Sequence, residues 1–122
     1  MMHRDIEHST QVACVRWFRY AYPGRLLFAI PNGGARSAVT GARLRDEGVT
    51  AGVPDLFICV PRGDFHGLFI EMKTPTGKLS AAQKQVAVQI EREGYKFAVC
   101  RSFDEFRQIV TDYMKKADTG QM

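Results

Sequence analysis

Short apolar runs alternate with amphipathic segments in the first half of the chain. Apolar side chains recur at helical spacing over residues 5–20, which predicts an amphipathic helix that ends before Pro23. Residues 26–30 form a continuous apolar run typical of a strand, and the turn-forming residues 31–34 interrupt it. Residues 37–47 then predict a second helix.

The second half of the chain predicts a hairpin followed by a crossover. Residues 56–60 and 68–72 are apolar on both faces and are joined by a short connection, which predicts two antiparallel strands in the interior of a sheet. A helix over residues 80–93 leads to a further strand at 96–100, and such a crossover places the two flanking strands parallel. A last helix is predicted over residues 103–116.

The order of these elements predicts an α/β fold. Helix, strand, helix, strand, strand, helix, strand, helix is typical of a mixed sheet flanked by helices on both faces. At 122 residues and 45% hydrophobic composition, the chain has the size of one ordinary domain. We expect a single domain over residues 1–122, with a core from about residue 5 to residue 114 and a frayed tail at 117–122.

Composition adds two expectations about partners and compartment. The chain has 17 Lys and Arg against 13 Asp and Glu, a net charge of +4, which mildly favours a polyanionic partner but is also common in domains that bind none. The cysteines, Cys14, Cys59 and Cys100, are odd in number and lack zinc spacing, which favours a reducing cytoplasm. No apolar run approaches the roughly 18 residues of a membrane span, so no membrane contact is expected.

Three charged residues stand beside or within the two central apolar runs. Asp55, Glu71 and Lys73 would cost free energy there unless they are paired or bind an ion. Glu71 and Lys73 are two positions apart, so both leave the same face of a strand. Asp55 joins them only if the hairpin pairs odd-numbered with odd-numbered residues, since a slip of one position would send it to the opposite face.

With the odd parity, two carboxylates and an ammonium converge at one end of the sheet. Two like charges repel unless a cation lies between them. Mg²⁺ prefers one or two protein carboxylates, with waters and substrate phosphate completing its shell. Such a site can hydrolyse a phosphodiester, with Lys73 orienting or activating the attacking water. The alternative from these residues alone is a structural ion pair between Lys73 and one of the two acids.

Several short motifs follow one another in a fixed order. They are Glu7 in the first helix, Asn32-Gly33-Gly34, Gly52-Val53-Pro54-Asp55, Glu71-Met72-Lys73, Gly77-x-Leu79-Ser80 and Gln83. In this set and order the chain resembles the VRR-NUC domain of the PD-(D/E)xK nuclease superfamily, from about residue 7 to residue 113. The resemblance implies a restriction-endonuclease-like αβββαβ core and a nuclease that depends on Mg²⁺ or Mn²⁺.

The resemblance also implies roles for individual residues of the central motifs. Asp55 and Glu71 would be the metal ligands, the backbone carbonyl of Met72 a further ligand, and Lys73 the catalytic lysine. No departure from the core motif is present in this sequence.

Two outer members of the catalytic set have simpler explanations as well. The resemblance implies that Glu7 supports the metal, often through water, and that Gln83 is the glutamine that follows the catalytic strand. Ser80 and Gln83 also have the spacing of a capping box, and one amide side chain could serve both purposes. Glu7 would otherwise be an ordinary exposed helix residue. Its neighbour His8 could approach the site or be merely exposed.

Residues on the loops and outer helices are candidates for contact with DNA. The free amides of Asn32, Gly33 and Gly34, with Arg36, precede a helix and could hold a phosphate, although a plain turn with a helix cap accounts equally well for them. A basic surface could extend over Arg43, Arg45, Arg62, Lys78 and Lys84. Scattered charges of this kind are also the usual state of exposed helices.

The function implied by the resemblance is that of a structure-specific DNA endonuclease. Small relatives act as homodimers on branched DNA such as four-way (Holliday) junctions, and a symmetric dimer presents the same site twice. The location implied is the cytoplasm of a bacterial or phage-infected cell. The alternative function is that of a catalytically idle DNA-binding module that retains the nuclease fold.

Overall fold

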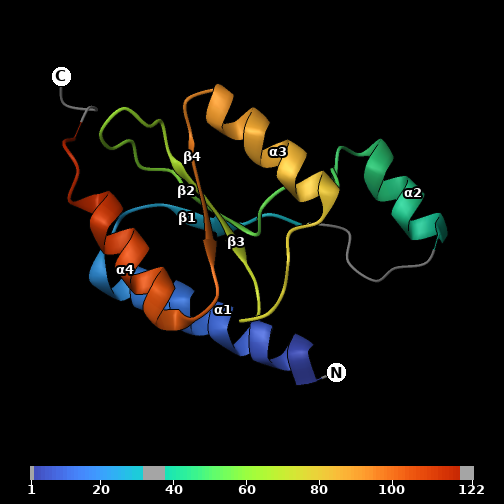
Figure 1. The fold of residues 1–122 in the computed structure, drawn as a ribbon, viewed down its shortest axis with the longest axis horizontal. Coiled ribbons are helices and arrows are strands. Elements are labelled where there is room, and N and C mark those ends of the chain that lie inside the picture. The colour runs from blue at the N-terminus through green and yellow to red at the C-terminus, as the bar shows by residue number, and fades with distance from the viewer. Residues whose placement is uncertain (1, 32–37, 119–122) are drawn as a thin grey trace.

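The computed structural model of the protein describes residues 2–31 and 38–118. Its elements follow one another in the predicted order (Figure 1). They are α1 (Met2–Ala21), β1 (Leu27–Ala29), α2 (Ala38–Asp46), β2 (Leu56–Ile58), β3 (Leu68–Met72), α3 (Ala81–Arg92), β4 (Lys96–Cys100) and α4 (Phe103–Met114). The predicted α/β class is therefore confirmed.

The strands form one mixed sheet in the order β1-β2-β3-β4. β1 pairs with β2 and β2 with β3 in the antiparallel sense, whereas β3 and β4, joined by α3, are parallel. The predicted hairpin and parallel crossover are both confirmed, and β2 and β3 are the interior strands. In the part of the chain that the structure describes, no helix is long and apolar enough to cross a bilayer.

Element boundaries differ from the sequence-based expectations by a few residues. The first helix begins at Met2 rather than at residue 5, and the last ends at Met114 rather than at residue 116. The strand predicted at 26–30 covers only Leu27–Ala29. Backbone hydrogen bonds from Cys59 N to Leu26 O (2.9 Å) and from Ile30 N to Asp55 O (2.8 Å) continue the pairing at both ends of that strand, so the apolar run does lie in the sheet.

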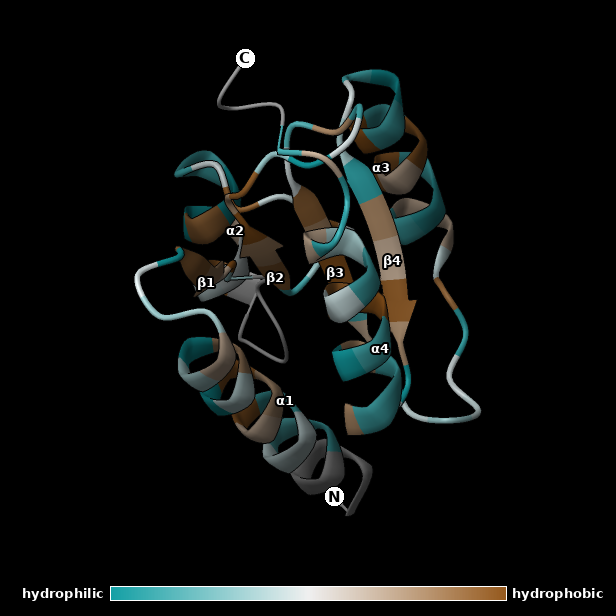
Figure 2. Ribbon diagram, turned by 90° about the vertical axis from the view of Figure 1, so that its left-hand side faces the viewer, coloured by the Kyte–Doolittle hydropathy of each residue, from teal (hydrophilic) through white to brown (hydrophobic). Residues whose placement is uncertain are grey.

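The core lies between one face of the sheet and the helices α1 and α4. Side chains from the two helices and from the central strands are buried there: Cys14, Phe18, Phe106, Val110, Tyr113, Leu56, Ile58, Leu68, Ile70 and Met72. Figure 2 shows the hydrophobic colour concentrated on the strands. Because side chains alternate along a strand, the even-numbered residues of β2 and β3 face this core. The odd-numbered residues are left for the other face, where α3 packs against β4.

Candidate active site

The register of the central hairpin decides whether the three charged residues meet. β2 and β3 pair so that Leu56 lies opposite Ile70 and Ile58 lies opposite Leu68. Continuing this register by one position places Asp55 opposite Glu71. Odd-numbered residues therefore face odd-numbered residues, and the predicted parity is confirmed.

Asp55 is held at the start of β2 by both its backbone and its side chain. Its carbonyl oxygen accepts a hydrogen bond from Ile30 N at 2.8 Å. Its carboxylate Oδ2 accepts one from Met72 N, also at 2.8 Å. Since β2 begins at Leu56, opposite Ile70, the amide of Met72 lies beyond the last strand pair, and the carboxylate takes the place of a backbone acceptor. The orientation of Asp55 is thus set by the hairpin itself.

Gly52 allows the segment before Asp55 to approach α3. The residue has a φ of +91°, and a Cβ atom there would lie 2.5 Å from the carbonyl oxygen of Ala82. A side chain at this position would therefore collide with the first turn of α3. The glycine keeps Asp55 and Gln83 within reach of the same cleft.

Glu71 is a buried acid with two polar neighbours. The residue is 4% exposed, and its Oε2 accepts a hydrogen bond from Gln83 Nε2 at 3.2 Å and lies 4.0 Å from Lys73 Nζ. Burial raises the pKa of Glu71 to about 8; the nearby Asp55 carboxylate adds to this rise and Lys73 opposes it. Lys73 therefore compensates the buried carboxylate only in part.

Gln83 uses the two ends of its amide for two purposes. The oxygen Oε1 accepts a hydrogen bond from Ser80 N at 2.8 Å, while Gln83 N donates to Ser80 Oγ at 3.1 Å, and together these bonds form a capping box. The amide nitrogen Nε2 is left to donate to Glu71. Helix capping and contact with the candidate site, the two alternatives from the sequence, are thus combined in one side chain.

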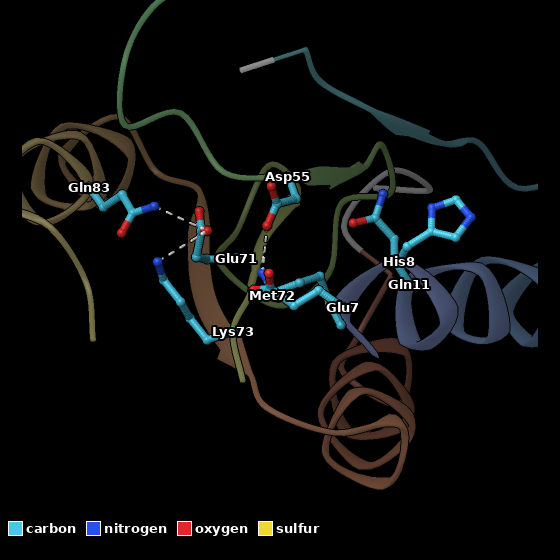
Figure 3. Close-up of a pocket in the computed structure, with 8 residues that line it drawn as sticks. All are labelled: Glu7, His8, Gln11, Asp55, Glu71, Met72, Lys73 and Gln83. Atoms are coloured by element: carbon cyan, nitrogen blue, oxygen red, sulfur yellow. Dashed lines mark hydrogen bonds and ion pairs between the residues drawn. The ribbon is translucent and has the colours of Figure 1, made fainter. Parts of the chain in front are cut away.

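A cleft of about 330 Å³ opens over these groups. Its lining consists of Glu7, His8, Gln11, Asp55, Glu71, Met72, Lys73 and Gln83 (Figure 3). In this view the three α1 residues lie on one side, Glu71, Lys73 and Gln83 on the other, and Asp55 with Met72 between them. The structure therefore brings together every residue that the sequence suggested for catalysis or metal binding.

Two residues of the lining were not assigned to the site from the sequence. Gln11 lies four positions after Glu7, so both side chains lie on the same face of α1. That spacing was the signal that could have identified it. For His8 the sequence left two alternatives, approach to the site or plain exposure, and the residue is exposed and also lines the cleft.

The residues expected to contact DNA outside the cleft differ in what the structure shows of them. Asn32, Gly33, Gly34 and Arg36 lie outside the described residues, and Lys78 is exposed but does not line the cleft. The expectation that Arg62 contributes to a basic surface is wrong.

Arg62 is a structural residue of the interior. It is 8% exposed, its Nε donates to the carbonyl of Met114 at 3.3 Å, and its Nη1 lies 3.5 Å from Asp118 Oδ1. These contacts tie the β2–β3 connection to the end of α4. A burial of this kind depends on tertiary packing and has no signature in the local sequence.

The oxygen donors of the cleft fit a hard divalent cation. Within residues 2–31 and 38–118, no group of three or more His, Cys, Asp or Glu side chains is arranged to hold a metal ion. The candidate donors are the carboxylates of Asp55 and Glu71 and the carbonyl of Met72. Mg²⁺ binds through one or two carboxylates and keeps several waters, so a small donor set of this type suits it.

Comparison with known proteins identifies the family of this chain. The model of the VRR-NUC domain family matches residues 5–104. The chain belongs to the VRR-NUC family. A solved structure described as a VRR_NUC domain protein is similar to it with a TM-score of 0.80 and 28% sequence identity, over 93% of this chain and 91% of that one. No curated protein matches the chain.

Membership of the VRR-NUC family identifies the chain as a nuclease-type domain. The VRR-NUC domain is a nuclease-type domain that processes DNA, and this chain carries it over most of its length. The expected fold is confirmed by the same solved structure. The cleft around Asp55, Glu71 and Lys73 is the candidate active site of this VRR-NUC domain.

Proposed function

We propose that this VRR-NUC domain is a divalent-metal-dependent endodeoxyribonuclease that hydrolyses DNA phosphodiester bonds. The observation that carries the proposal is the meeting of Asp55 and Glu71 across the hairpin, beside Lys73, in an open cleft. A buried Glu71 beside a half-buried Asp55, with one nearby lysine, is costly as a purely structural arrangement. It is well suited to binding a cation and a phosphate.

Asp55, Glu71 and the carbonyl of Met72 would hold Mg²⁺ or Mn²⁺, with Glu7 supporting the ion through water. The raised pKa of Glu71 supports this assignment, because burial and the neighbouring acid leave its ionised form undercompensated. When bound, such an ion neutralises charge on the phosphate and activates water for attack.

The remaining residues of the cleft have roles in positioning and charge. The Lys73 ammonium orients the attacking water and offsets the negative charge that develops on the phosphate. The side-chain amide of Gln83 holds the Glu71 carboxylate through its hydrogen bond of 3.2 Å. These groups are in place before a substrate arrives, which reduces the reorganisation that the reaction requires.

The substrate that we propose is branched DNA, in particular the four-way junction, cut by a homodimer. A two-fold symmetric dimer presents two copies of the cleft, which suits two opposed strands of a junction. Such an enzyme would work in the cytoplasm of a bacterial or phage-infected cell. A monomer in sedimentation at working concentration would argue strongly against junction resolution.

The direct test is cleavage of a panel of labelled DNAs by the whole chain. Linear duplex, flap, fork and four-way junction DNAs are incubated with Mg²⁺, with Mn²⁺ and with a chelator. We expect cleavage only with a divalent ion, and a loss of at least about a hundred-fold in Lys73→Ala protein with DNA affinity nearly unchanged, because the lysine acts mainly in the transition state.

The matched control is Lys115→Ala. Lys115 is an exposed lysine at the C-terminal cap of α4 and does not line the cleft, so this variant should cut as the wild-type chain does. Undiminished cleavage in Lys73→Ala protein would contradict the mechanism. DNA binding without cleavage under any metal condition would identify the domain as an idle DNA-binding module.

A further inference from the structure

A second hollow lies on α1 directly beside the cleft. It measures about 270 Å³, and its lining, His8, Gln11, Val12, Val15, Arg16 and Arg19, comes entirely from α1. We call these residues the α1 stripe, because they recur every three to four positions and so follow one side of the helix. His8 and Gln11 belong to both hollows, and Figure 3 shows them on the α1 side of the cleft. The stripe is thus continuous with the candidate active site.

The charge of the α1 stripe is positive, and no residue that the structure describes neutralises it. Arg16 and Arg19 are exposed, and neither makes a hydrogen bond or ion pair with any residue that the structure describes. Among the described residues that line the hollow there is no Asp or Glu. Val12 and Val15 provide apolar surface along which the arginine stems can lie with their guanidinium groups in solvent. An anionic partner is therefore complementary to the stripe.

The helix dipole explains only part of this pattern. Arg19 lies in the last turn of α1, where a cation is favoured by the dipole whatever the function. Arg16 lies about one turn earlier and gains little from that effect. From His8 to Arg19 the helix rises about 16 Å at 1.5 Å per residue. Measured along the axis of a B-DNA duplex, where one strand has a phosphate every 3.4 Å, that length corresponds to about five phosphates.

We propose that the α1 stripe binds the sugar-phosphate backbone of the DNA strand that enters the cleft. Arg16 and Arg19 contact phosphates of this strand outside the cleft, and His8 and Gln11 line its path to the reacting phosphate. The inference rests on the proposed nuclease function and adds to it the route of the substrate strand. The contacts are to the backbone, so they carry affinity without reading base sequence.

Binding of labelled DNA by the whole chain in chelator tests the stripe without cleavage. A four-way junction and a linear duplex are titrated at several salt concentrations with wild-type protein and with the double variant Arg16→Ala/Arg19→Ala. We expect the double variant to bind both DNAs on the order of ten-fold more weakly, and the slope of log affinity against log salt to become shallower by about two. Alanine is the best helix former, so α1 is preserved.

Two comparison variants isolate the charge on the stripe. Arg92→Ala removes an exposed arginine from the last turn of α3, the end of that helix away from Gln83, and should leave affinity and salt slope unchanged. Arg16→Lys/Arg19→Lys keeps both charges and should keep the wild-type salt slope. Equal binding by the double alanine variant and Arg92→Ala protein would overturn the inference. So would an equal loss of salt slope in the alanine and lysine double variants.

These experiments distinguish an error in the proposed role of the α1 stripe from an error in the proposed nuclease function. If the double alanine variant binds DNA normally while the wild-type chain cuts DNA with a divalent ion, only the stripe is refuted. If the wild-type chain cuts no DNA but its binding depends on Arg16 and Arg19, the nuclease is refuted and the arginines remain a DNA contact.

Discussion

The two sides of the cleft differ in how firmly they are held. We define the β3–α3 wall as Glu71, Lys73 and Gln83, and the α1 wall as Glu7, His8 and Gln11. In the β3–α3 wall each residue makes a hydrogen bond or ion pair with another residue of the wall. In the α1 wall none of the three side chains makes a hydrogen bond or ion pair with a described residue.

This difference matches two separate requirements of a nuclease. Groups that act on the reacting phosphate work best when their positions are set beforehand, because the protein then pays no reorganisation during the reaction. Groups that receive a flexible substrate benefit from free hydrogen-bonding capacity. The β3–α3 wall has the properties of the first kind, and His8 and Gln11 of the α1 wall have those of the second. Three further predictions test whether the two walls differ in this way.

The largest expected effect is the pH dependence of stability in the absence of divalent ions. Glu71 has a folded-state pKa of about 8 against a reference value of 4.5. Between pH 4.5 and about 8 the Glu71 carboxyl keeps its proton in the folded state but loses it in the unfolded state. The contribution of Glu71 to the free energy of unfolding is therefore largest below pH 4.5 and is lost as the pH rises to about 8. Urea denaturation in chelator should show the free energy of unfolding falling over this range, by on the order of a few kcal/mol.

The control for this prediction is Glu71→Gln, which cannot ionise at that position. Its free energy of unfolding should change less between pH 4.5 and 8 than that of the wild-type chain. Mg²⁺ should stabilise the wild-type chain at pH 8 more than the variant, since an ion that binds only the folded state adds to its stability. Identical pH profiles for the two proteins would show that Glu71 is not the buried, poorly compensated acid described above.

The second prediction concerns Arg101, which extends the β3–α3 wall. Its Nη1 donates to the carbonyl of Thr74 at 2.9 Å and also to the carbonyl of Gly77, so it clamps the loop between Lys73 and α3. Arg101→Ala should lower the free energy of unfolding by about 2 kcal/mol, as loss of charged hydrogen bonds does. Cleavage should fall about ten-fold with unchanged DNA affinity, because Lys73 is less well positioned.

Arg107→Ala is the matched control for Arg101. Arg107 is exposed and only approaches Asp104, at 4.0 Å, so its loss should change the free energy of unfolding by less than about 0.5 kcal/mol. Denaturant unfolding and single-turnover cleavage measure both effects. Similar losses in the two variants would mean that Arg101 has no special role in holding the loop.

The smallest expected effects come from the same substitution made on each wall. Gln83→Ala removes the capping contact with Ser80 and the bond to Glu71, and should cost about 1–2 kcal/mol of stability. Gln11→Ala removes a side chain without such bonds among the described residues, and should cost less than about 0.5 kcal/mol. Thermal or urea denaturation of the pair measures the comparison directly, and equal costs would remove the distinction between the walls.

Much of the candidate site could be predicted from the sequence because it depends on residue spacing within single strands and helices. The spacing of Glu71 and Lys73 puts them on one face of any strand, and the capping-box spacing of Ser80 and Gln83 predicts the start of α3. Because side chains alternate along a strand, Asp55 could lie either on the face of Glu71 and Lys73 or on the opposite face. The register in the structure selects one of them.

Local rules place Gln11 on the same face of α1 as Glu7, but they do not show that this face meets the cleft or that two arginines are buried or clamping. Gln11 reaches the cleft because tertiary packing brings α1 beside Asp55 and Glu71, and Arg62 is buried because it meets the end of α4 at the carbonyl of Met114. Arg101 meets Thr74 and Gly77 because β3 and β4 are parallel neighbours whose ends coincide.

Sequence alone was sufficient to predict the order of helices and strands, the apolar faces that form the core, and Asp55, Glu71 and Lys73 as candidates for chemistry. These follow from periodicity and from the cost of placing charge in apolar runs. Three features depend on tertiary packing: the helix that closes the cleft, the amide end of Gln83 that meets Glu71, and the exposure of individual arginines. Such contacts join segments far apart in the chain, and side-chain periodicity within one segment carries no information about the packing of another.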